Sequence, residues 1–189
     1  TPGVYIIEKN AFPNSVVEVA TAIPAFIGHT QFARDGNKDL TDIPFRISSM
    51  AEFHSFFGFA PTLRFGIRPE DSESEDTTND INVLFPDGSC QLTLPKTFYA
   101  LYYNMLLFYA NGGGPCYIVS VGDYEHDFKS IDFTNALLAL KKEQEPTLVV
   151  VPEAVYMEEG DCYKVQTAAL MHCGNDMKNR FAILDVFNG

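Results

Sequence analysis

Apolar residues recur with two different spacings in the second half of the chain. Short apolar runs at 116–121, 147–151 and 181–186 predict buried strands. In the intervening stretches, 132–145 and 162–173, apolar residues recur every three or four positions, which predicts helices. Strands that alternate with helices imply right-handed crossovers and a largely parallel sheet.

The first half supplies further elements of the same domain. Residues 24–30 are typical of a buried strand, and residues 43–47 of a short extended segment after a polar loop at 31–42. Ser49 and Glu52 form a capping box, and Gly58 supplies a left-handed end, so a helix is expected between them.

A longer helix and a hairpin lie between these halves. Apolar side chains at helical spacing predict a helix over 98–109, which ends at the glycine run 112–114. The β-prone runs 83–85 and 90–94 flank a Pro-Asp-Gly-Ser turn and predict a hairpin. The fold class expected is α/β, with a mostly parallel or mixed sheet flanked by helices and an extended N-terminal arm.

The N-terminal residues and one acidic stretch differ from the rest of the pattern and define the expected domain organisation. Residues 1–20 hold two β-prone runs interrupted around Pro13, and an isolated strand needs a sheet to join. We therefore expect a linking arm at 1–20 and an α/β domain at 21–189. Residues 68–82 are strongly acidic and contain no aromatic side chain, which indicates a solvated acidic loop within that domain.

Composition narrows the function classes. The chain has 189 residues and a formal net charge of −12, so its surface repels phosphate backbones and anionic lipids. No apolar run approaches the roughly 20 residues of a membrane span. We expect one domain with no nucleic-acid partner and no membrane insertion. The four cysteines are scattered, which favours reduced thiols over a disulfide framework.

An α/β enzyme is the alternative function considered. Asp185 lies near the end of a predicted strand, where α/β enzymes place catalytic carboxylates, and His29 ends the first strand. Together with Cys116 they would make a His–Asp–Cys grouping. No motif marks a nucleophile, so the simpler expectation is that Asp185 caps a loop or pairs with a cation such as Arg180.

Two loops resemble ligand sites only in part. Residues 111–114 are rich in glycine but follow a helix and precede a strand, which reverses the order of a phosphate-binding loop, so a helix cap is expected. Asp35, Asn37 and Asp39 mimic the start of a calcium loop. The sixth position lacks Gly and the twelfth lacks Glu, so a polar surface loop is expected.

Cys162, His172 and Cys173 raise the question of a metal site. Adjacent helical residues point about 100° apart, so His172 and Cys173 are poorly placed to share one ion. No paired-ligand spacing typical of zinc is present. We expect neither a metal nor a cofactor.

Four blocks stand out in order along the chain. They are Thr1-Pro2-Gly3-Val4-Tyr5-Ile6-Ile7-Glu8, then 21–28 (TAIPAFIG), then 108–119 (FYANGGGPCYIV), and last the set 152–154 (PEA), 172–173 (HC) and 180–185 (RFAILD). Together they resemble the tail sheath proteins of contractile phage tails and of related phage-tail-like contractile injection systems. The resemblance spans the whole chain.

The resemblance implies a structural subunit without catalysis. Sheath subunits form a helical stack of hexameric rings around an inner tube and contract to drive that tube through a target envelope. The implied partners are other sheath subunits, the inner tube protein and a baseplate. Assembly would take place in the bacterial cytoplasm, as a component of a phage tail or a phage-tail-like particle.

The resemblance also gives the arm a role. The arm of one sheath subunit adds a strand to a neighbour, which tethers subunits that must slide without separating. Here the inter-subunit residues would be Pro2, Gly3, Val4, Tyr5, Ile6, Ile7 and Glu8. Sheath proteins continue into a C-terminal domain that is absent before Gly189, so no tube-contacting residue is assigned.

Overall fold

The computed structural model describes residues 22–63, 65–69, 80–86, 88–93 and 97–188. Its centre is a five-stranded sheet with the order β10-β9-β1-β8-β4. The four strands β10, β9, β1 and β8 are parallel, and β4 is antiparallel to β8. The strands are β1 (Pro24–Gly28), β4 (Phe45–Ile47), β8 (Cys116–Ser120), β9 (Leu148–Val150) and β10 (Phe181–Ile183).

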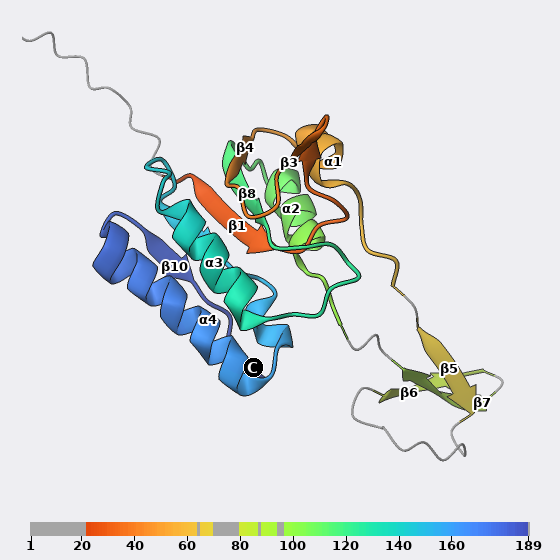
Figure 1. Ribbon diagram of the computed structural model, residues 1–189. Coiled ribbons are helices and arrows are strands. Elements are labelled where there is room, and N and C mark those ends of the chain that lie inside the picture. The colour runs from red at the N-terminus through yellow and green to blue at the C-terminus, as the bar shows by residue number, and fades with distance from the viewer. Residues whose placement is uncertain (1–21, 64, 70–79, 87, 94–96, 189) are drawn as a thin grey trace, which may run out of the picture.

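Helices cover both faces of this sheet (Figure 1). They are α1 (Met50–Phe57), α2 (Leu101–Ala110), α3 (Ser130–Leu140) and α4 (Glu159–Met171), with a 3-10 turn, η1 (Ala154–Tyr156), and a π-helical turn, η2 (His172–Met177). Successive strand residues face opposite sides, so Ala25 and Ile27 of β1 pack against α3 and α4, whereas Phe26 packs against α1 and α2. The α/β prediction is confirmed, and the arm at 1–20 lies outside the described residues.

The connections after β1 lead first to one side of this strand and later to the other. The chain leaves β1 through α1 and α2 and returns as β8 on one side. It then crosses to β9 on the other side of β1 and continues outward to β10. The carboxyl ends of β1 and β9 are therefore the switch point, where open α/β sheets usually leave a ligand crevice.

The caps of α1 are close to those predicted. The Ser49 hydroxyl accepts a hydrogen bond from the Glu52 backbone N–H (3.2 Å), and Gly58 has a positive φ of 86°. The Glu52 carboxylate accepts from the backbone N–H of Ser48 (2.6 Å), so the reciprocal bond falls one residue before the cap.

Two helix starts differ from the prediction. Helix α2 begins at Leu101, three residues after Phe98, whose ring stacks on Tyr103. Helix α3 begins at Ser130, two residues before the predicted start at 132, and Asp132 lies in its first turn. In both cases apolar periodicity identified the helix but placed its start two or three residues away from the observed one.

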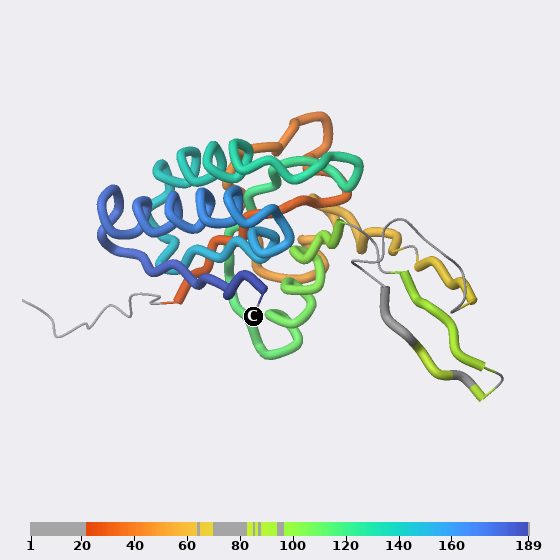
Figure 2. The backbone as a smooth tube through the Cα atoms, turned by 90° about the horizontal axis from the view of Figure 1, so that it is seen from below, coloured from red at the N-terminus to blue at the C-terminus, as the bar shows by residue number. Residues whose placement is uncertain are grey.

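A second, three-stranded sheet stands away from this body (Figures 1 and 2). Its antiparallel order is β5-β7-β6, and the predicted hairpin is confirmed as β6 and β7. The ends of the expected acidic loop are strand residues, and its middle, 70–79, lies outside the described residues. The strands are β5 (Gly66–Pro69), β6 (Asp80–Phe85) and β7 (Gly88–Thr93).

The expected polar loop at 31–42 contains a small hairpin. Strands β2 (Arg34–Asp35) and β3 (Lys38–Asp39) pair across a turn at Gly36, which has a positive φ of 58°. Leu40, directly after β3, is fully buried and holds the hairpin against the body.

Candidate functional site

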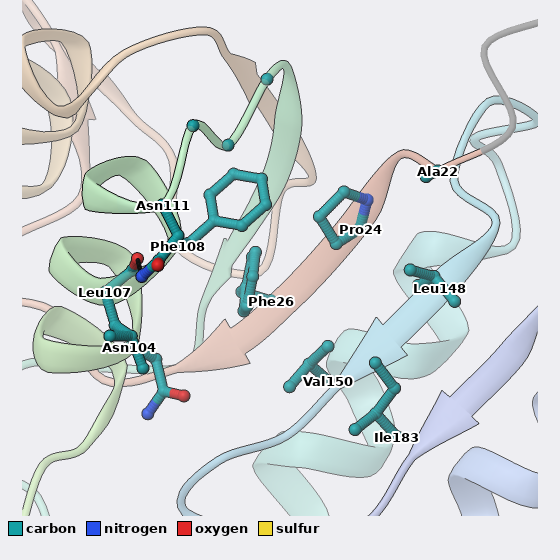
Figure 3. Close-up of a pocket in the computed structure, with 13 residues that line it drawn as sticks. Ala22, Pro24, Phe26, Asn104, Leu107, Phe108, Asn111, Leu148, Val150 and Ile183 are labelled. Carbon is teal, nitrogen blue, oxygen red and sulfur yellow. Dashed lines mark hydrogen bonds between the residues drawn. The ribbon is translucent and has the colours of Figure 1, made fainter.

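An apolar groove lies on the face of the sheet that carries α1 and α2 (Figure 3). Leu148 and Val150 of β9 and Ile183 of β10 form one wall, and Leu107 and Phe108 of α2 form the other. The groove has a volume of about 640 Å³. Its lining is mainly apolar, and Asn104 and Asn111 contribute polar side chains. A lining of this kind suits an apolar surface better than a charged ligand.

The outer edge next to this groove is also apolar. Phe181 is 77% exposed, Ile183 is 51% exposed, and Val186, just after β10, is 78% exposed. Strand β10 is the last strand of the sheet on this side, among the described residues. A strand at a sheet edge has unpaired backbone groups, so this edge combines apolar side chains with free hydrogen-bonding capacity.

The glycine run at the rim of the groove is a helix cap, as predicted. The Gly113 N–H donates to the Phe108 carbonyl (2.9 Å) and the Gly112 N–H donates to the Tyr109 carbonyl (3.1 Å), which is a Schellman motif. Gly112 has a positive φ of 81°, and a Cβ on Gly113 would lie 2.5 Å from the Phe108 ring. The turn itself therefore requires glycine at position 112, and a side chain at position 113 would have to displace the Phe108 ring.

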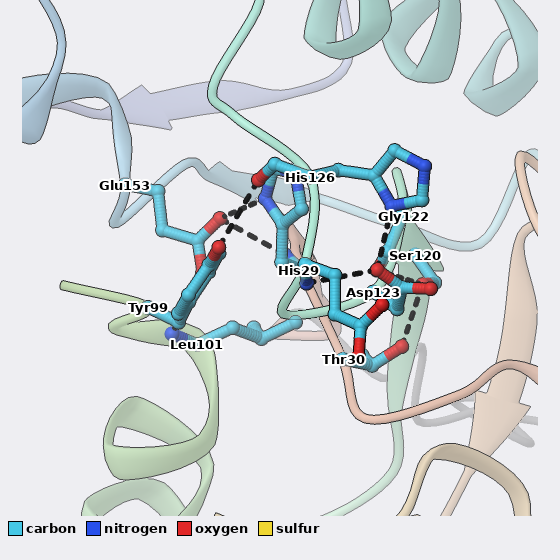
Figure 4. A network of polar contacts seen from close by, with 10 residues as sticks. His29, Thr30, Tyr99, Leu101, Ser120, Gly122, Asp123, His126 and Glu153 are labelled. Carbon is cyan, nitrogen blue, oxygen red and sulfur yellow. Dashed lines mark hydrogen bonds and ion pairs between the residues drawn. The ribbon is translucent and has the colours of Figure 1, made fainter. Parts of the chain in front are cut away.

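A buried polar centre occupies the switch point (Figure 4). The Glu153 carboxylate, fully buried after β9, accepts from the His29 backbone N–H (2.9 Å) through Oε2. The same oxygen lies 2.8 Å from His29 Nδ1. The other oxygen, Oε1, accepts from the Leu101 backbone N–H (3.3 Å). One carboxylate thus joins the ends of β1 and β9 to the start of α2.

This carboxylate serves as the missing cap of α2. Ala100, at the N-cap position, offers no side-chain acceptor, and Glu153 supplies one from another element. A negative charge at a helix N-terminus is also stabilised by the helix dipole. Gly28 makes the approach possible, because a Cβ there would lie 2.9 Å from Leu101 Cβ and 3.1 Å from Glu153 Cδ.

Aromatic rings surround His29. The ring centroids of Tyr99, Phe128 and Phe133 lie between 5.0 and 5.7 Å from its imidazole, and the side chain is 1% exposed. His29 Nε2 has no hydrogen-bond partner. Neither the groove nor the polar hollow described next is lined by His29 or Glu153.

A polar hollow of about 480 Å³ lies beyond the ends of β1 and β8. Its lining includes Asp123 and His126, whose Oδ1 and Nδ1 atoms are 2.5 Å apart. A hydrogen bond from the Glu125 backbone N–H is the main cause that lowers the pKa of the Asp123 carboxyl. Both side chains are largely solvated, so this pair forms an ordinary surface contact.

The His29–Asp185–Cys116 grouping does not form. His29 pairs with Glu153, and Asp185 is exposed two strands away beyond β10. Cys116 begins β8, at the opposite end of the sheet from His29. Burial raises the pKa of its thiol to about 11, so it is a protonated core residue and a poor nucleophile at neutral pH.

Arg180, the cation expected to pair with Asp185, has other partners. Arg180 is buried and donates from Nη1 to the Leu140 carbonyl (3.1 Å) and from Nη2 to the Glu143 carbonyl, just beyond α3. Its Nη1 also lies 3.0 Å from His172 Nε2, which acts as the acceptor. Arg180 therefore ties β10 to the end of α3.

The other sequence candidates also have structural roles. Cys162 and Cys173 are buried in the core between the sheet and α4, and no group of three metal-binding side chains occurs in the described ranges. Asp39 accepts from the backbone N–H and hydroxyl of Thr41 (2.8 and 2.7 Å). The arm residues 2–8 lie outside the described residues.

Sequence reasoning missed Glu153 as a polar centre. The available signal was a carboxylate placed among apolar residues directly after a fully apolar strand. Such a residue is either a loop residue or a buried group with partners, and the partner His29 is 124 positions away. Only the parallel pairing of β1 and β9 brings the two together.

No model of a protein family matches the sequence, and a search of curated proteins finds no significant match. Within the described part of the chain, every helix is too short or too polar to cross a membrane.

Proposed function

We propose that this chain is a structural subunit of a contractile tail sheath, in which copies stack as hexameric rings around an inner tube. The observation that carries the proposal is the apolar surface formed by the groove and the edge of β10. A monomer rarely leaves so many large apolar side chains in one exposed region, and such regions commonly mark contacts between proteins. The partners would be other copies, the tube protein and a baseplate.

The placement of the resembling blocks supports this proposal. Residues 21–28 include the central strand β1, and residues 108–119 include the cap of α2 and most of β8. The last block includes Glu153, Arg180 and β10. The last three blocks lie within the packed body, which in a sheath would move as a rigid unit while contacts between subunits change.

Negative-stain electron microscopy of the full-length protein is the direct test. We expect tubes or stacked rings, and dispersed monomers under all assembly conditions would contradict the proposal.

A deletion of residues 1–8 is expected to abolish polymerisation and leave the melting temperature nearly unchanged. A variant with the same eight residues in scrambled order controls for chain length. A large drop in melting temperature would show that the arm belongs to its own core.

A further inference from the structure

Strands β9 and β10 are largely open on the face of the sheet that carries α1 and α2, among the described residues. Leu148 and Val150 are only half-buried there, and Ile183 is 51% exposed. The side chains on this face of β1, β9 and β10 form two cross-strand rows, which are Pro24–Leu148–Phe181 and Phe26–Val150–Ile183. Every member of both rows is apolar, so this half of the sheet is an apolar surface without a helix over it.

The order of the strands explains why this surface is open. The crossovers from β8 to β9 and from β9 to β10 run in the same direction along the sheet. Right-handed crossovers in one direction place their helices on one face, so α3 and α4 both cover the opposite face. The crossover through α1 and α2 runs the other way and covers β1, β8 and β4.

The N-terminal part of the chain joins the body at this same place. Ala22, the first described residue, lines the groove (Figure 3). The backbone N–H of Ile23 donates to the Thr147 hydroxyl, just before β9 (3.1 Å). The nearest preceding residues, which lie outside the described residues, include the run 16–20 (VVEVA). An apolar stretch of sequence is therefore joined to the rim of an apolar groove.

We propose that residues 16–20 lie in the groove of their own chain and cover Leu148, Val150 and Ile183. Successive side chains of an extended segment face opposite sides, so Val17 and Val19 face the groove while Glu18 stays in water. Such docking removes two apolar surfaces from water at once. This contact forms within a single chain, so the proposal goes beyond the tail sheath function and does not rest on it.

The outer edge of the sheet stays free in this arrangement. Phe181 and Val186 are not part of the groove lining, and both remain exposed beyond it. The edge of β10 is therefore still available for a contact between copies.

The length of the segment fits the groove. The part of α2 that lines it, from Asn104 to Asn111, is about 10 Å long at the helical rise per residue. Four extended residues, 16–19, span about 13 Å. Residues 20 and 21 are then left for the turn that leads back to Ala22.

The polar side chains of the groove wall suit a polypeptide backbone. Asn104 donates through Nδ2 to the Ala100 carbonyl (3.0 Å), and Asn111 donates through Nδ2 to the Leu107 carbonyl (2.7 Å). The side-chain oxygens of both residues can accept hydrogen bonds. The backbone N–H groups of a docked segment need such acceptors when they leave water.

The covalent connection favours this segment over the same residues of a second chain. Residue 20 is separated from Ala22 by a single residue, and a short linker gives an effective concentration on the order of millimolar. A second chain would have to reach a similar concentration in solution to compete. The contact is therefore expected in the monomer.

Charged substitutions in the segment test the contact through stability. We expect Val17→Asp combined with Val19→Asp to lower the folding equilibrium constant about tenfold or more, the contribution of one buried valine side chain. Urea unfolding measures this constant. The wild-type value should not depend on protein concentration, since no second chain takes part. An unchanged constant in the variant, or a wild-type stability that rises with concentration, would overturn the proposal.

Val4 and Ile6 provide the matched control. They are also apolar, are also two positions apart, and lie in the same N-terminal part of the chain. Val4→Asp combined with Ile6→Asp adds the same charge and should leave the folding equilibrium constant nearly unchanged. An equal loss in both double variants would show that added charge, and not the groove, is the cause.

Nuclear Overhauser effects in the wild type keep the test independent of the variants. With labelled methyl groups, we expect such effects from Val17 and Val19 to Val150 and Ile183. An isotope-filtered measurement on an equal mixture of labelled and unlabelled chains should show none of these contacts between different chains. Contacts between different chains would assign the groove to a second copy and overturn the proposal, as would the absence of any contact between Val17 or Val19 and the groove.

Discussion

At the scale of single residues, Gly28 is the position most sensitive to a small change. A Cβ there would lie 2.9 Å from Leu101 Cβ and 3.1 Å from Glu153 Cδ, both of which are fixed by packing and hydrogen bonds. We predict that Gly28→Ala lowers the free energy of unfolding by about 2 kcal/mol, as overpacked cores do. Chemical denaturation measures this loss.

Gly160 provides the matched control for this substitution. It lies in the first turn of α4, and a Cβ there would meet nothing within 4 Å. Gly160→Ala should therefore stabilise the chain by about 0.5–1 kcal/mol, the usual gain in a helix. Equal effects of the two substitutions would show that Leu101 and Glu153 are not packed tightly against Gly28.

His172 makes the stability of the fold depend on pH. Its imidazole is 2% exposed and accepts from Arg180, and burial is the main cause that lowers its pKa to about 4. Below pH 6.5 this histidine becomes protonated in the unfolded chain, whereas in the folded chain it stays neutral down to about pH 4. We predict a loss of up to about 3 kcal/mol as pH falls through this interval.

The substitution His172→Gln separates this titration from packing. Glutamine keeps an acceptor for Arg180 but does not titrate, so the variant should lose less stability than the wild type between pH 6.5 and pH 4. Urea unfolding at several pH values gives both slopes. Identical slopes would assign the acid sensitivity to other groups.

At the scale of elements, the sequence predicted those features that depend on residues close together in the chain. The strands of the main sheet, α1 with its Ser49 cap and the Schellman end of α2 follow from periodicity and from turn residues. The start of α2 was not predictable, since its cap is Glu153, 52 positions away. The grouping of His29, Asp185 and Cys116 was wrong because strand order and strand ends, which sequence did not give, keep these residues apart.

The β5-β7-β6 sheet is expected to be separable from the α/β body. Among the described residues its strands pair with one another, and Gly66 is paired with Thr93, so the chain enters and leaves the sheet side by side. We predict that replacing residues 66–93 with a short Gly-Ser linker leaves the α/β body folded, with a change in melting temperature of only about 4 °C or less, the shift expected from about 1 kcal/mol. Circular dichroism during heating measures this change.

Loss of cooperative unfolding in that variant would show that the small sheet helps to build the body. A second linker of twice the length is the control for closure strain, because loop-closure entropy changes slowly with length. If only the shorter linker destabilises the body, the cause is strain and not a missing contact.

At the scale of the whole molecule, the proposed function makes the apolar edge of β10 a contact between copies. Phe181 is 77% exposed, and its side chain contributes little to the stability of the monomer. We predict that Phe181→Asp changes the free energy of unfolding by less than about 0.5 kcal/mol, as exposed substitutions usually do. In the full-length protein the same change should prevent assembly, because it places a charge in an apolar contact.

Leu84 on β6 gives the control, since it is 85% exposed on the projecting sheet and accepts the same substitution. Sedimentation velocity and electron microscopy of both variants separate the two surfaces. If Leu84→Asp blocks assembly and Phe181→Asp does not, subunits meet through the small sheet. If neither variant blocks assembly, the exposed edge of β10 is not a contact between copies, and the groove beside it requires a different explanation.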